Sequence, residues 1–274
     1  MSYNRVTALA GTTQHARGII IEKPMLYICI PAYNESPTIG LLLWRIRKVF
    51  EEHPREYEIV VLDDGSTDAT AETLKSYADS LPLTVLHHET RRGYAAALDT
   101  LSRTVAKGTR YPRRDAMVIM QADFTDQPEH IPELVKLFEG GADMVVAERP
   151  AGNDGAPAAV RRLRRVAPWL VRPMVKVPGV HDSLGTFRLY RIAVMRDVIR
   201  ASESVPIVQW SGWAANAELL VKAAPFCRRI ETVPLGARYD LRPRATRVRP
   251  FEGAMDLYRF GWTKRARRLT TDSA

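Results

Sequence analysis

Cysteine is scarce in this chain of 274 residues, which contains two, Cys29 and Cys227. Two thiols so far apart in the sequence cannot build a metal site, and we expect both to be buried and reduced, as in a reducing cytoplasm. The sequence also lacks any run of eighteen or more apolar residues, so we expect no membrane-spanning helix. The start of the chain is polar through Gly18 and has no apolar signal segment, so we do not expect secretion.

Two other absences narrow the range of partners. No glycine-rich loop with a following lysine appears after the first predicted strand, which argues against a nucleotidyltransferase. No segment resembles a nucleic-acid-binding module, although the formal net charge is +9 and the pI is near 9.7. A basic excess favours an anionic partner. Because it gathers at 161–176 and 228–268, we expect a phosphorylated substrate or an anionic membrane rather than nucleic acid.

The pattern of apolar runs predicts an α/β fold. Hydrophobic residues form 46% of the chain, which is enough for a large core. Strands that alternate with helices at this spacing predict a largely parallel, doubly wound sheet. The first helix is expected soon after Pro31, with Ser36 as its N-cap and Pro37 in its first turn. The expected strands are 25–31, 57–63, 82–88, 115–121 and 142–147.

The second half of the chain is expected to add a strand within 181–190, a strand pair near 228–240 and a helix at 212–224. We find no internal repeat and no linker that would separate a second domain. The predicted organisation is a flexible N-terminal arm at 1–22, one domain at 23–250, and a basic amphipathic helix with a tail at 251–274.

Three polar segments follow the first, second and fourth predicted strands. They are Ile30-Pro-Ala-Tyr-Asn-Glu35, Val61-Leu-Asp-Asp-Gly-Ser-Thr-Asp68 and Met120-Gln-Ala-Asp-Phe-Thr-Asp126. In open α/β sheets, ligands bind outside the carboxyl ends of the strands. The second and third segments bring carboxylates to this rim, which suits ribose hydroxyls, a nucleobase edge or a hard cation. Gly65 permits a tight turn after the adjacent carboxylates Asp63 and Asp64.

The three segments resemble those of the family 2 glycosyltransferases with the GT-A fold. Within that family they are most similar to the dolichol-phosphate mannose synthases and related polyprenyl-phosphate glycosyltransferases, and the resemblance extends to about residue 250. It implies a Rossmann-like GT-A sheet flanked by helices, and an inverting transfer from a nucleotide diphosphate sugar. The nucleotide-binding residues that it implies are Pro31, Tyr33, Glu35, Asp63 or Asp64, Gln121 and Ala122.

In this family the third segment reads Asp-x-Asp, and its last carboxylate binds a divalent cation that bridges the two phosphates of the donor. The resemblance assigns that role to Asp123, with Mg²⁺ or Mn²⁺ as the cofactor. Gln121 replaces the first aspartate; it can still contact ribose or offer an oxygen to the metal, but without charge. We therefore expect a lower metal affinity, which Asp126 can offset directly or through water. The alternative is a nucleotide-sugar-binding protein that has lost catalysis.

Two further segments carry predicted site residues. The segment His181-Asp-Ser-Leu-Gly-Thr-Phe-Arg-Leu-Tyr190 resembles Asp-x-x-(Ser/Gly)-Gly-Phe-Arg of the family, which implies that Asp182 faces the sugar and the reacting centre and that Arg188 braces the site. Glu218 lies where the family places another sugar-binding carboxylate. Arg92-Gly93-Tyr94 begins a predicted helix, and the N-terminus of a helix suits an anion; a plain helix start explains this segment equally well.

Arginines are the predicted acceptor-binding residues. Arg149 ends the fifth strand, where the polyprenyl-phosphate branch has Ser-Arg; here Glu148 stands in place of the serine. Arg149 would bind the acceptor phosphate through two hydrogen bonds, and the alternative is a surface ion pair. The other predicted phosphate-binding residues are Arg164, Arg242, Arg244 and Arg247, of which the last three form a solvated basic loop in the alternative reading.

Two predicted helices, at 158–176 and 251–268, combine apolar and aromatic residues with arginine and lysine. Such helices suit an anionic membrane interface, and the polyprenyl-phosphate branch has interface helices in these places. Alternatively, each apolar stripe packs on the catalytic domain. We therefore expect a cytoplasmic protein that associates peripherally with the inner face of a membrane.

The nature of the acceptor decides which residues the reaction needs. A phosphate monoester is largely ionised at pH 7 and needs arginines but no general base. A hydroxyl acceptor would need a carboxylate to take its proton, and Asp182 is then the candidate. The leading hypothesis is a glycosyltransferase that acts on a polyprenyl phosphate at the membrane surface. The first alternative, which Gln121 and Glu148 favour, is a soluble glycosyltransferase for a small-molecule or natural-product hydroxyl.

Overall fold

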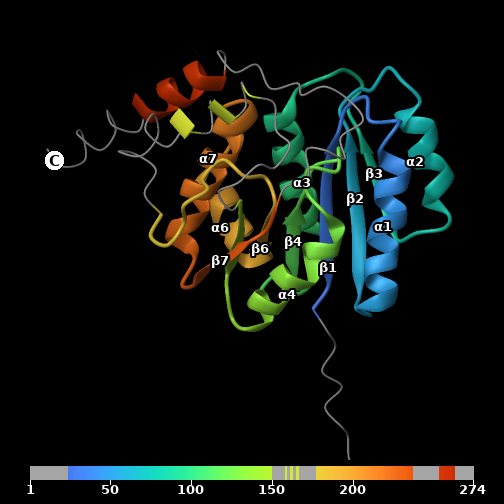
Figure 1. Ribbon diagram of the computed structural model, residues 1–274, viewed down its shortest axis with the longest axis horizontal. Helices are drawn as coiled ribbons and strands as arrows, with labels where there is room; N and C mark the ends of the chain where they lie inside the picture. The colour runs from blue at the N-terminus through green and yellow to red at the C-terminus, as the bar shows by residue number, and fades with distance from the viewer. Residues whose placement is uncertain are drawn as a thin grey trace, which may run out of the picture.

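A computed structural model describes residues 24–149, 177–236 and 253–262, together with 158, 161–162 and 165–166. A seven-stranded sheet runs through the described part of the chain in the order β3-β2-β1-β4-β6-β5-β7 (Figure 1). Its strands are β1 (Leu26–Ala32), β2 (Tyr57–Asp63), β3 (Leu83–His87), β4 (Ala116–Ile119), β5 (Met144–Glu148), β6 (Arg188–Arg191) and β7 (Ile230–Pro234).

The sheet is mostly parallel. β6 runs antiparallel to both of its neighbours, β4 and β5, and the remaining neighbouring pairs are parallel. Since β6 is reversed, the residues that precede it reach the same edge of the sheet as the residues that follow β4 and β5. The α/β class and the mostly parallel sheet expected from the sequence are confirmed.

Helices cover both faces of the sheet. One face packs against α1, α2 and α4, and the other packs against α3, α6 and α7. The helix bounds are α1 (Ile39–Glu52), α2 (Thr70–Ala78), α3 (Tyr94–Gly108), α4 (Ile131–Glu139), α6 (Ile192–Ala201) and α7 (Gly212–Ala223). Short 3-10 segments stand at Pro128–His130 and Ala224–Phe226. Residues 253–262 are also helical and lie at the top of Figure 1, the end to which the parallel strands point.

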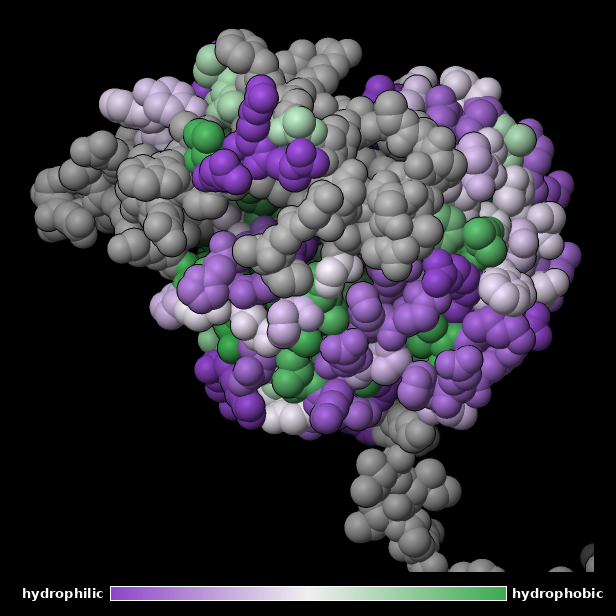
Figure 2. Space-filling model, in the orientation of Figure 1, coloured by the Kyte–Doolittle hydropathy of each residue, from purple (hydrophilic) through white to green (hydrophobic). Residues whose placement is uncertain are grey.

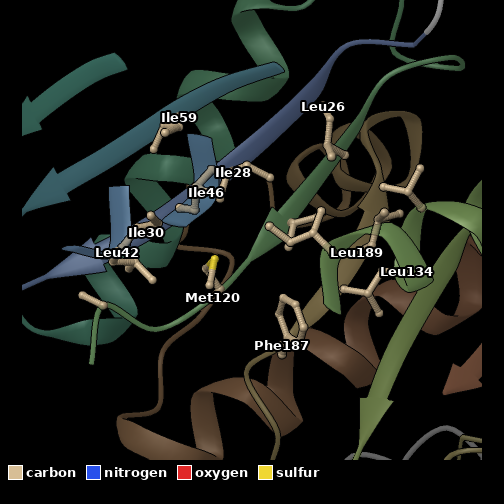
Figure 3. Close-up of a cluster of buried hydrophobic side chains, with 14 of the residues drawn as sticks. Leu26, Ile28, Ile30, Leu42, Ile46, Ile59, Met120, Leu134, Phe187 and Leu189 are labelled. Carbon is tan, nitrogen blue, oxygen red and sulfur yellow. The ribbon is translucent and has the colours of Figure 1, made fainter. Parts of the chain in front are cut away.

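The core is split by the sheet into two layers. Along β1, Ile28 and Ile30 point to the layer beneath α1, whereas Cys29 points to the layer beneath α3. Figure 3 shows the first layer, in which Leu42 from α1 and Phe187 meet the strands. These side chains are buried, so the sheet forms a rigid base for the loops at its edge.

The helix starts differ from the expected ones. α1 begins at Ile39 and not near Ser36, whose N–H donates to Asp68 Oδ2 (3.2 Å). The sequence pattern predicts that the helix after the second strand begins near Thr67, but α2 begins at Thr70, because the N–H of Thr67 donates to Asn34 Oδ1 (2.8 Å). In both cases contacts between the first two polar segments hold the chain outside the helix. The sequence patterns also missed α6 (Ile192–Ala201).

The remaining expectations meet mixed outcomes. Both cysteines are free; Cys29 is buried, but Cys227 is partly exposed, and burial raises the pKa of both thiols.

The strand pair expected near 228–240 is a single strand, β7, within the described residues. None of the described helices has the length and apolarity needed to cross a bilayer. In Figure 2 the described surface is largely hydrophilic, with small apolar patches. The division at 1–22, 23–250 and 251–274 stays a prediction.

Candidate active site

The carboxyl ends of β1, β2 and β4 bring the three polar segments to one edge of the sheet. β1 lies between β2 and β4, and its register pairs Ala32 with Asp63. Beyond the strands, the N–H of Asp64 donates to the carbonyl of Ala32 (2.9 Å), and the N–H of Met120 donates to the carbonyl of Cys29 (3.2 Å). The three segments therefore share one rim, where ligands of open α/β sheets bind.

Hydrogen bonds join the first segment to the second. The N–H of Asn34 donates to Ser66 Oγ (2.8 Å), and the N–H of Glu35 donates to Thr70 Oγ1 (2.9 Å). Asn34 has a φ of 50°, a left-handed conformation that asparagine tolerates better than most residues. The Glu35 side chain is buried, and its Oε2 accepts from Thr38 Oγ1 (3.2 Å). The first segment is thus fixed before any ligand binds.

Asp63, at the end of β2, is buried beside a histidine of β3. Its Oδ2 lies 3.3 Å from His87 Nδ1, and its Oδ1 accepts from the N–H of Ser66 (3.0 Å). None of the sequence motifs singled out His87. The parallel register, which pairs Asp63 with His87, was the signal that could have found it.

Asp64 holds the loop that precedes α3. Its Oδ1 lies 2.7 Å from His88 Nδ1 and accepts from the N–H of Arg92 (2.9 Å); its Oδ2 accepts from the N–H of Gly93 (2.7 Å). His88 Nε2 in turn lies 3.1 Å from Thr100 Oγ1 on α3. The start of this helix, predicted as an alternative anion site, therefore holds the protein's own carboxylate. Between the two carboxylates named for the nucleotide, this arrangement favours Asp63.

The turn after Asp64 packs closely against residues 90–91. Gly65 has a φ of +67°, and a Cβ at this position would lie 2.7 Å from the backbone nitrogen of Arg91. Glycine is therefore required here for both its conformation and its lack of a side chain. The guanidinium carbon of Arg91 lies 4.2 Å from the centre of the Tyr33 ring, a cation–π contact that joins the loop to the first segment.

Asp123 and Asp126 lie in the turn that follows β4, and both are buried. Asp123 Oδ1 accepts from the N–H of Thr125 (3.1 Å), and Asp126 Oδ2 accepts from the N–H of Gln121 (3.0 Å). Gln121 Nε2 donates to Thr186 Oγ1 (2.8 Å). Because its amide nitrogen is bonded in this way, the carbonyl oxygen of Gln121 is the end that can serve a metal or a ribose hydroxyl.

The carboxylates of Asp123 and Asp182 lie close enough to that of Asp126 to repel it, and we call the three residues the acidic cluster. Burial raises the pKa of Asp126 to about 6. The Arg149 guanidinium, 3.9 Å away, and the N–H of Gln121 oppose this rise, whereas the carboxylates of Asp123 and Asp182 add to it. Burial and the neighbouring carboxylates thus together disfavour the ionised form of Asp126.

Asp182 lies in the turn before β6, and Arg188 holds this turn. Asp182 Oδ1 accepts from the N–H groups of Leu184 and Gly185 (both 2.9 Å). Arg188 is fully buried, and its Nη2 donates to the carbonyl of Ser183 (2.7 Å). The geometry makes Arg188 a brace for Asp182, and a direct part in the chemistry stays a prediction.

Asn216, on α7, links this turn to α3. Its carbonyl accepts from Arg188 Nη1 (2.6 Å), and its Nδ2 donates to the carbonyl of Leu184 (2.9 Å). Its Oδ1 accepts from the hydroxyl of Tyr94 (2.7 Å). No sequence pattern points to Asn216, since these contacts join segments that only the folded chain brings together.

Glu218, predicted to contact the sugar, has partners from the protein itself. Its Oε2 accepts from the N–H groups of Gln209 (2.7 Å) and Trp210 (3.1 Å), and its Oε1 pairs with Lys222 Nζ (2.8 Å). The residue is 3% exposed. This is the setting of a structural carboxylate that fixes the loop before α7, and the geometry lends no support to the sugar contact.

Arg149 follows β5 and lines a pocket together with Asp126, Thr125 and Gly185. Its side chain is 14% exposed and pairs with Asp126, whose side chain is 3% exposed, so this ion pair is largely buried. Glu148 Oε1 instead accepts from the N–H of His181 (2.5 Å), which ties the end of β5 to the segment before β6.

The other predicted residues are less informative. Pro31 is partly exposed within β1, and Ala122 is buried beside Asp123. The remaining predicted phosphate-binding arginines lie outside the described residues; they are Arg164, Arg242, Arg244 and Arg247.

The donor set suits a divalent cation that shares its coordination with a diphosphate. Within the described ranges, no three His, Cys, Asp or Glu side chains form a metal site by themselves. Mg²⁺ commonly takes one or two carboxylates and completes its shell with substrate phosphates and water. Asp123, with the carbonyl oxygen of Gln121, provides such a partial set next to the excess negative charge of the acidic cluster. The residues present therefore fit Mg²⁺ or Mn²⁺.

Several known proteins are related to this chain in sequence. The family profile described as "Glycosyl transferase family 2" matches residues 27–199. A bactoprenol glucosyl transferase of Shigella phage SfV is 30% identical over 208 residues, which cover 72% of this chain and 62% of the phage protein. The bactoprenol glucosyl transferase of Shigella phage SfX is 32% identical over 175 residues, 62% of this chain and 53% of that protein. The chain thus spans less than two thirds of the length of these relatives.

A solved structure has the same fold. Glucosyl-3-phosphoglycerate synthase from Mycobacterium tuberculosis, in complex with Mn²⁺, uridine diphosphate and glucosyl-3-phosphoglycerate, matches with a TM-score of 0.56 at 21% identity. The match covers 86% of this chain and 76% of that one. The GT-A fold is thereby confirmed. With three polar segments on one rim of such a sheet and a profile match over most of it, the chain belongs to glycosyl transferase family 2.

Proposed function

We propose that this chain transfers a sugar from a nucleotide diphosphate sugar to a polyprenyl phosphate, with inversion at the anomeric carbon. The observation that carries this proposal is the acidic cluster beside Arg149, at the ends of β4 and β5. Carboxylates suit a cation shared with a diphosphate, and a neighbouring arginine suits an acceptor phosphate. The relatives named bactoprenol glucosyl transferase support a polyprenyl acceptor and make glucose the first sugar to test.

The nucleotide would bind across the first two segments. The ring of Tyr33, backed by Arg91, offers a face for stacking, and the carboxylate of Asp63 suits a ribose hydroxyl or a base edge. Because Asn34 and Ser66 already fix these segments to each other, little ordering is needed when the nucleotide binds.

The reaction would be one displacement at the anomeric carbon. An oxygen of the acceptor phosphate forms the new bond while the bond to the leaving diphosphate oxygen breaks. A phosphate monoester is largely ionised at pH 7 and needs no general base. Arg149 would orient it, and Asp182 would face the sugar. Bound at Asp123 and Gln121, a divalent cation would supply neutralisation of the charge on the leaving nucleoside diphosphate.

The helix at 253–262 supports action at the cytoplasmic surface of a membrane. Leu257 and Phe260 are buried, and the Phe260 ring meets the Trp210 ring edge to face (6.1 Å). Tyr258 and Trp262, one helical turn apart, are instead 47% and 53% exposed. Two of the three aromatic residues of the described helix therefore face outward, as an interface helix requires.

The first test is nucleoside diphosphate release from uridine diphosphate glucose and a panel of other nucleotide sugars. The reactions contain Mn²⁺ or Mg²⁺, with and without a short polyprenyl phosphate. The proposal predicts release that needs both the lipid phosphate and the cation. Release without the lipid would favour the soluble glycosyltransferase and make Asp182 the candidate base. Nucleotide binding without any release would favour the non-catalytic sugar-nucleotide-binding protein.

The membrane contact is tested separately with anionic vesicles. The double variant Tyr258→Ser, Trp262→Ser should sediment with them less than the unchanged protein does. Trp44→Ser is the matched control, because Trp44 is equally exposed (48%) but lies on α1. Equal sedimentation of all three proteins would remove this helix from the proposal.

A further inference from the structure

We propose that Arg45, on α1, is a positioning residue that holds the turn carrying Asp123 in the conformation the site needs. Arg45 lies outside the three polar segments and contacts the third of them from the neighbouring helix. The inference rests on the proposed function only where it states that the turn binds a cation with a nucleotide. The brace itself is a property of the ligand-free protein.

The turn needs a brace because of Phe124. This residue has a φ of 62°, in the left-handed region that bulky side chains avoid, and it is buried. It stands directly after Asp123. A return of Phe124 to ordinary backbone angles would redirect the chain at that point and move Asp123 relative to Asp126. Such conformations persist only where surrounding contacts hold them.

Two contacts on Phe124 lead to Arg45. The guanidinium carbon of Arg45 lies 5.6 Å from the centre of the Phe124 ring, within cation–π range. The carbonyl of Phe124 accepts from Gln127 Nε2 (2.6 Å), and Gln127 Oε1 accepts from Arg45 Nη1 (3.4 Å). Arg45 therefore holds both the ring of Phe124 and the amide that binds its carbonyl.

Arg45 is itself held in place from the far side of the turn. Its Nε donates to Glu129 Oε1 (2.7 Å), in the short 3-10 segment that follows the turn. Its helix is anchored by the buried side chains of Leu42 and Ile46. One guanidinium thus joins a rigid helix to the strained turn and to the 3-10 segment that follows it.

The plainer reading is a surface ion pair between Arg45 and Glu129, whose side chains are 28% and 45% exposed. Such pairs contribute little to stability. The chain offers a matched control, since Arg47 on the same helix pairs with Glu51 at 2.8 Å and is 51% exposed. That pair lies within α1, whereas the contacts of Arg45 reach the turn.

The experiment compares Arg45→Met with Arg47→Met in the ligand-free protein by hydrogen exchange. We expect amides of residues 121–127 to exchange about tenfold faster in Arg45→Met and at an unchanged rate in Arg47→Met. Equal exchange in the two variants would overturn the proposal. Arg45→Lys keeps the charge but loses the forked guanidinium that contacts the Phe124 ring and the Gln127 amide together. It should show the same faster exchange, and it replaces Arg45→Met if that variant does not fold.

Binding of uridine diphosphate, measured by calorimetry with and without Mn²⁺, tests the consequence. In Arg45→Met the affinity with Mn²⁺ should fall about tenfold, because Asp123 is displaced, while the metal-free affinity stays unchanged. An equal fall in both conditions would contradict a role confined to this turn. Faster exchange in Arg45→Met, with no Mn²⁺-dependent binding even in the unchanged protein, would keep the brace and reject the proposed function.

Discussion

At the β2–β3 end of the site each buried carboxylate lies beside a histidine, whereas at the β4–β5 end the buried carboxylate of Asp126 lies near two other carboxylates. Asp64 accepts from two backbone N–H groups and lies against His88. Asp126 accepts from one backbone N–H, lies 3.9 Å from an arginine and has two carboxylates nearby. The partners of Asp64 thus come from the protein, whereas a cation bound at the second end would reduce the repulsion that raises the pKa of Asp126.

This difference assigns different work to residues of the same type. A buried carboxylate that is fully hydrogen-bonded fixes its neighbours, as Asp64 fixes the loop before α3. A buried carboxylate near others of its kind is costly in the free protein and gains when a cation arrives. Removing the partner of Asp64 should therefore change folding, and substitution of Asp123 should change ligand binding and catalysis.

The largest effect is expected for Asp123→Asn. It removes the charge that would hold the cation and should lower nucleoside diphosphate release roughly a hundredfold to a thousandfold. Asp197→Asn is the control, because Asp197 pairs with Arg200 on α6. A calorimetric titration of Mn²⁺ with uridine diphosphate present should show weaker binding for Asp123→Asn alone. Full activity in Asp123→Asn would contradict the assignment of the cation to this carboxylate.

His88→Leu should act on stability. It leaves Asp64 Oδ1 without its imidazole partner in a buried setting, which should lower the free energy of unfolding by about 2 kcal/mol. His87→Leu is the matched control, because the side chain of His87 is 51% exposed. Urea unfolding of both variants measures the difference. Equal losses would show that the two carboxylates of β2 are held alike.

Asp126→Asn should stabilise the protein while it weakens catalysis. Since folding raises the pKa of Asp126 to about 6, its favourable contribution is complete below its unfolded pKa and is lost as the pH rises through 6. A rise of the pKa from 3.8 to about 6 corresponds to roughly 3 kcal/mol, so in metal-free buffer at pH 8 the variant should gain up to this amount in unfolding free energy. At pH 4 the gain should vanish. Thermal unfolding at both pH values decides this, and a gain that ignores pH would refute the electrostatic cause.

The smallest effect is expected for Gln121→Asp. A second charged ligand should tighten Mn²⁺ binding in the presence of uridine diphosphate by about threefold to tenfold. Added repulsion with Asp126, whose Oδ2 accepts from the backbone of this residue, limits the gain. The calorimetric titration used for Asp123→Asn measures it. Weaker Mn²⁺ binding would mean that Gln121 does not lie beside the cation.

The sequence predicted the strands and their shared rim because apolar runs followed by polar segments are local features. It did not predict the helix starts and residue roles that depend on contacts between segments. Ser36 was expected to cap α1, but its N–H bonds Asp68 in the second segment. Neither Asn216 nor Arg45 belongs to a sequence motif. Their partners lie 32 and 82 residues away in the chain, so only the folded chain brings them together. The sequence allows an anion site at the helix start near Gly93, but in the structure the N–H of Gly93 donates to the carboxylate of Asp64.

The N–H of His181 donates to Glu148 Oε1, and this hydrogen bond joins the end of β5 to the turn before β6. β5 and β6 pair antiparallel in the sheet, so this hydrogen bond brings together the two ends of the intervening chain. The entropy of loop closure grows only with the logarithm of loop length. We therefore expect the number of residues between Glu148 and His181 to have little effect on the stability of the sheet.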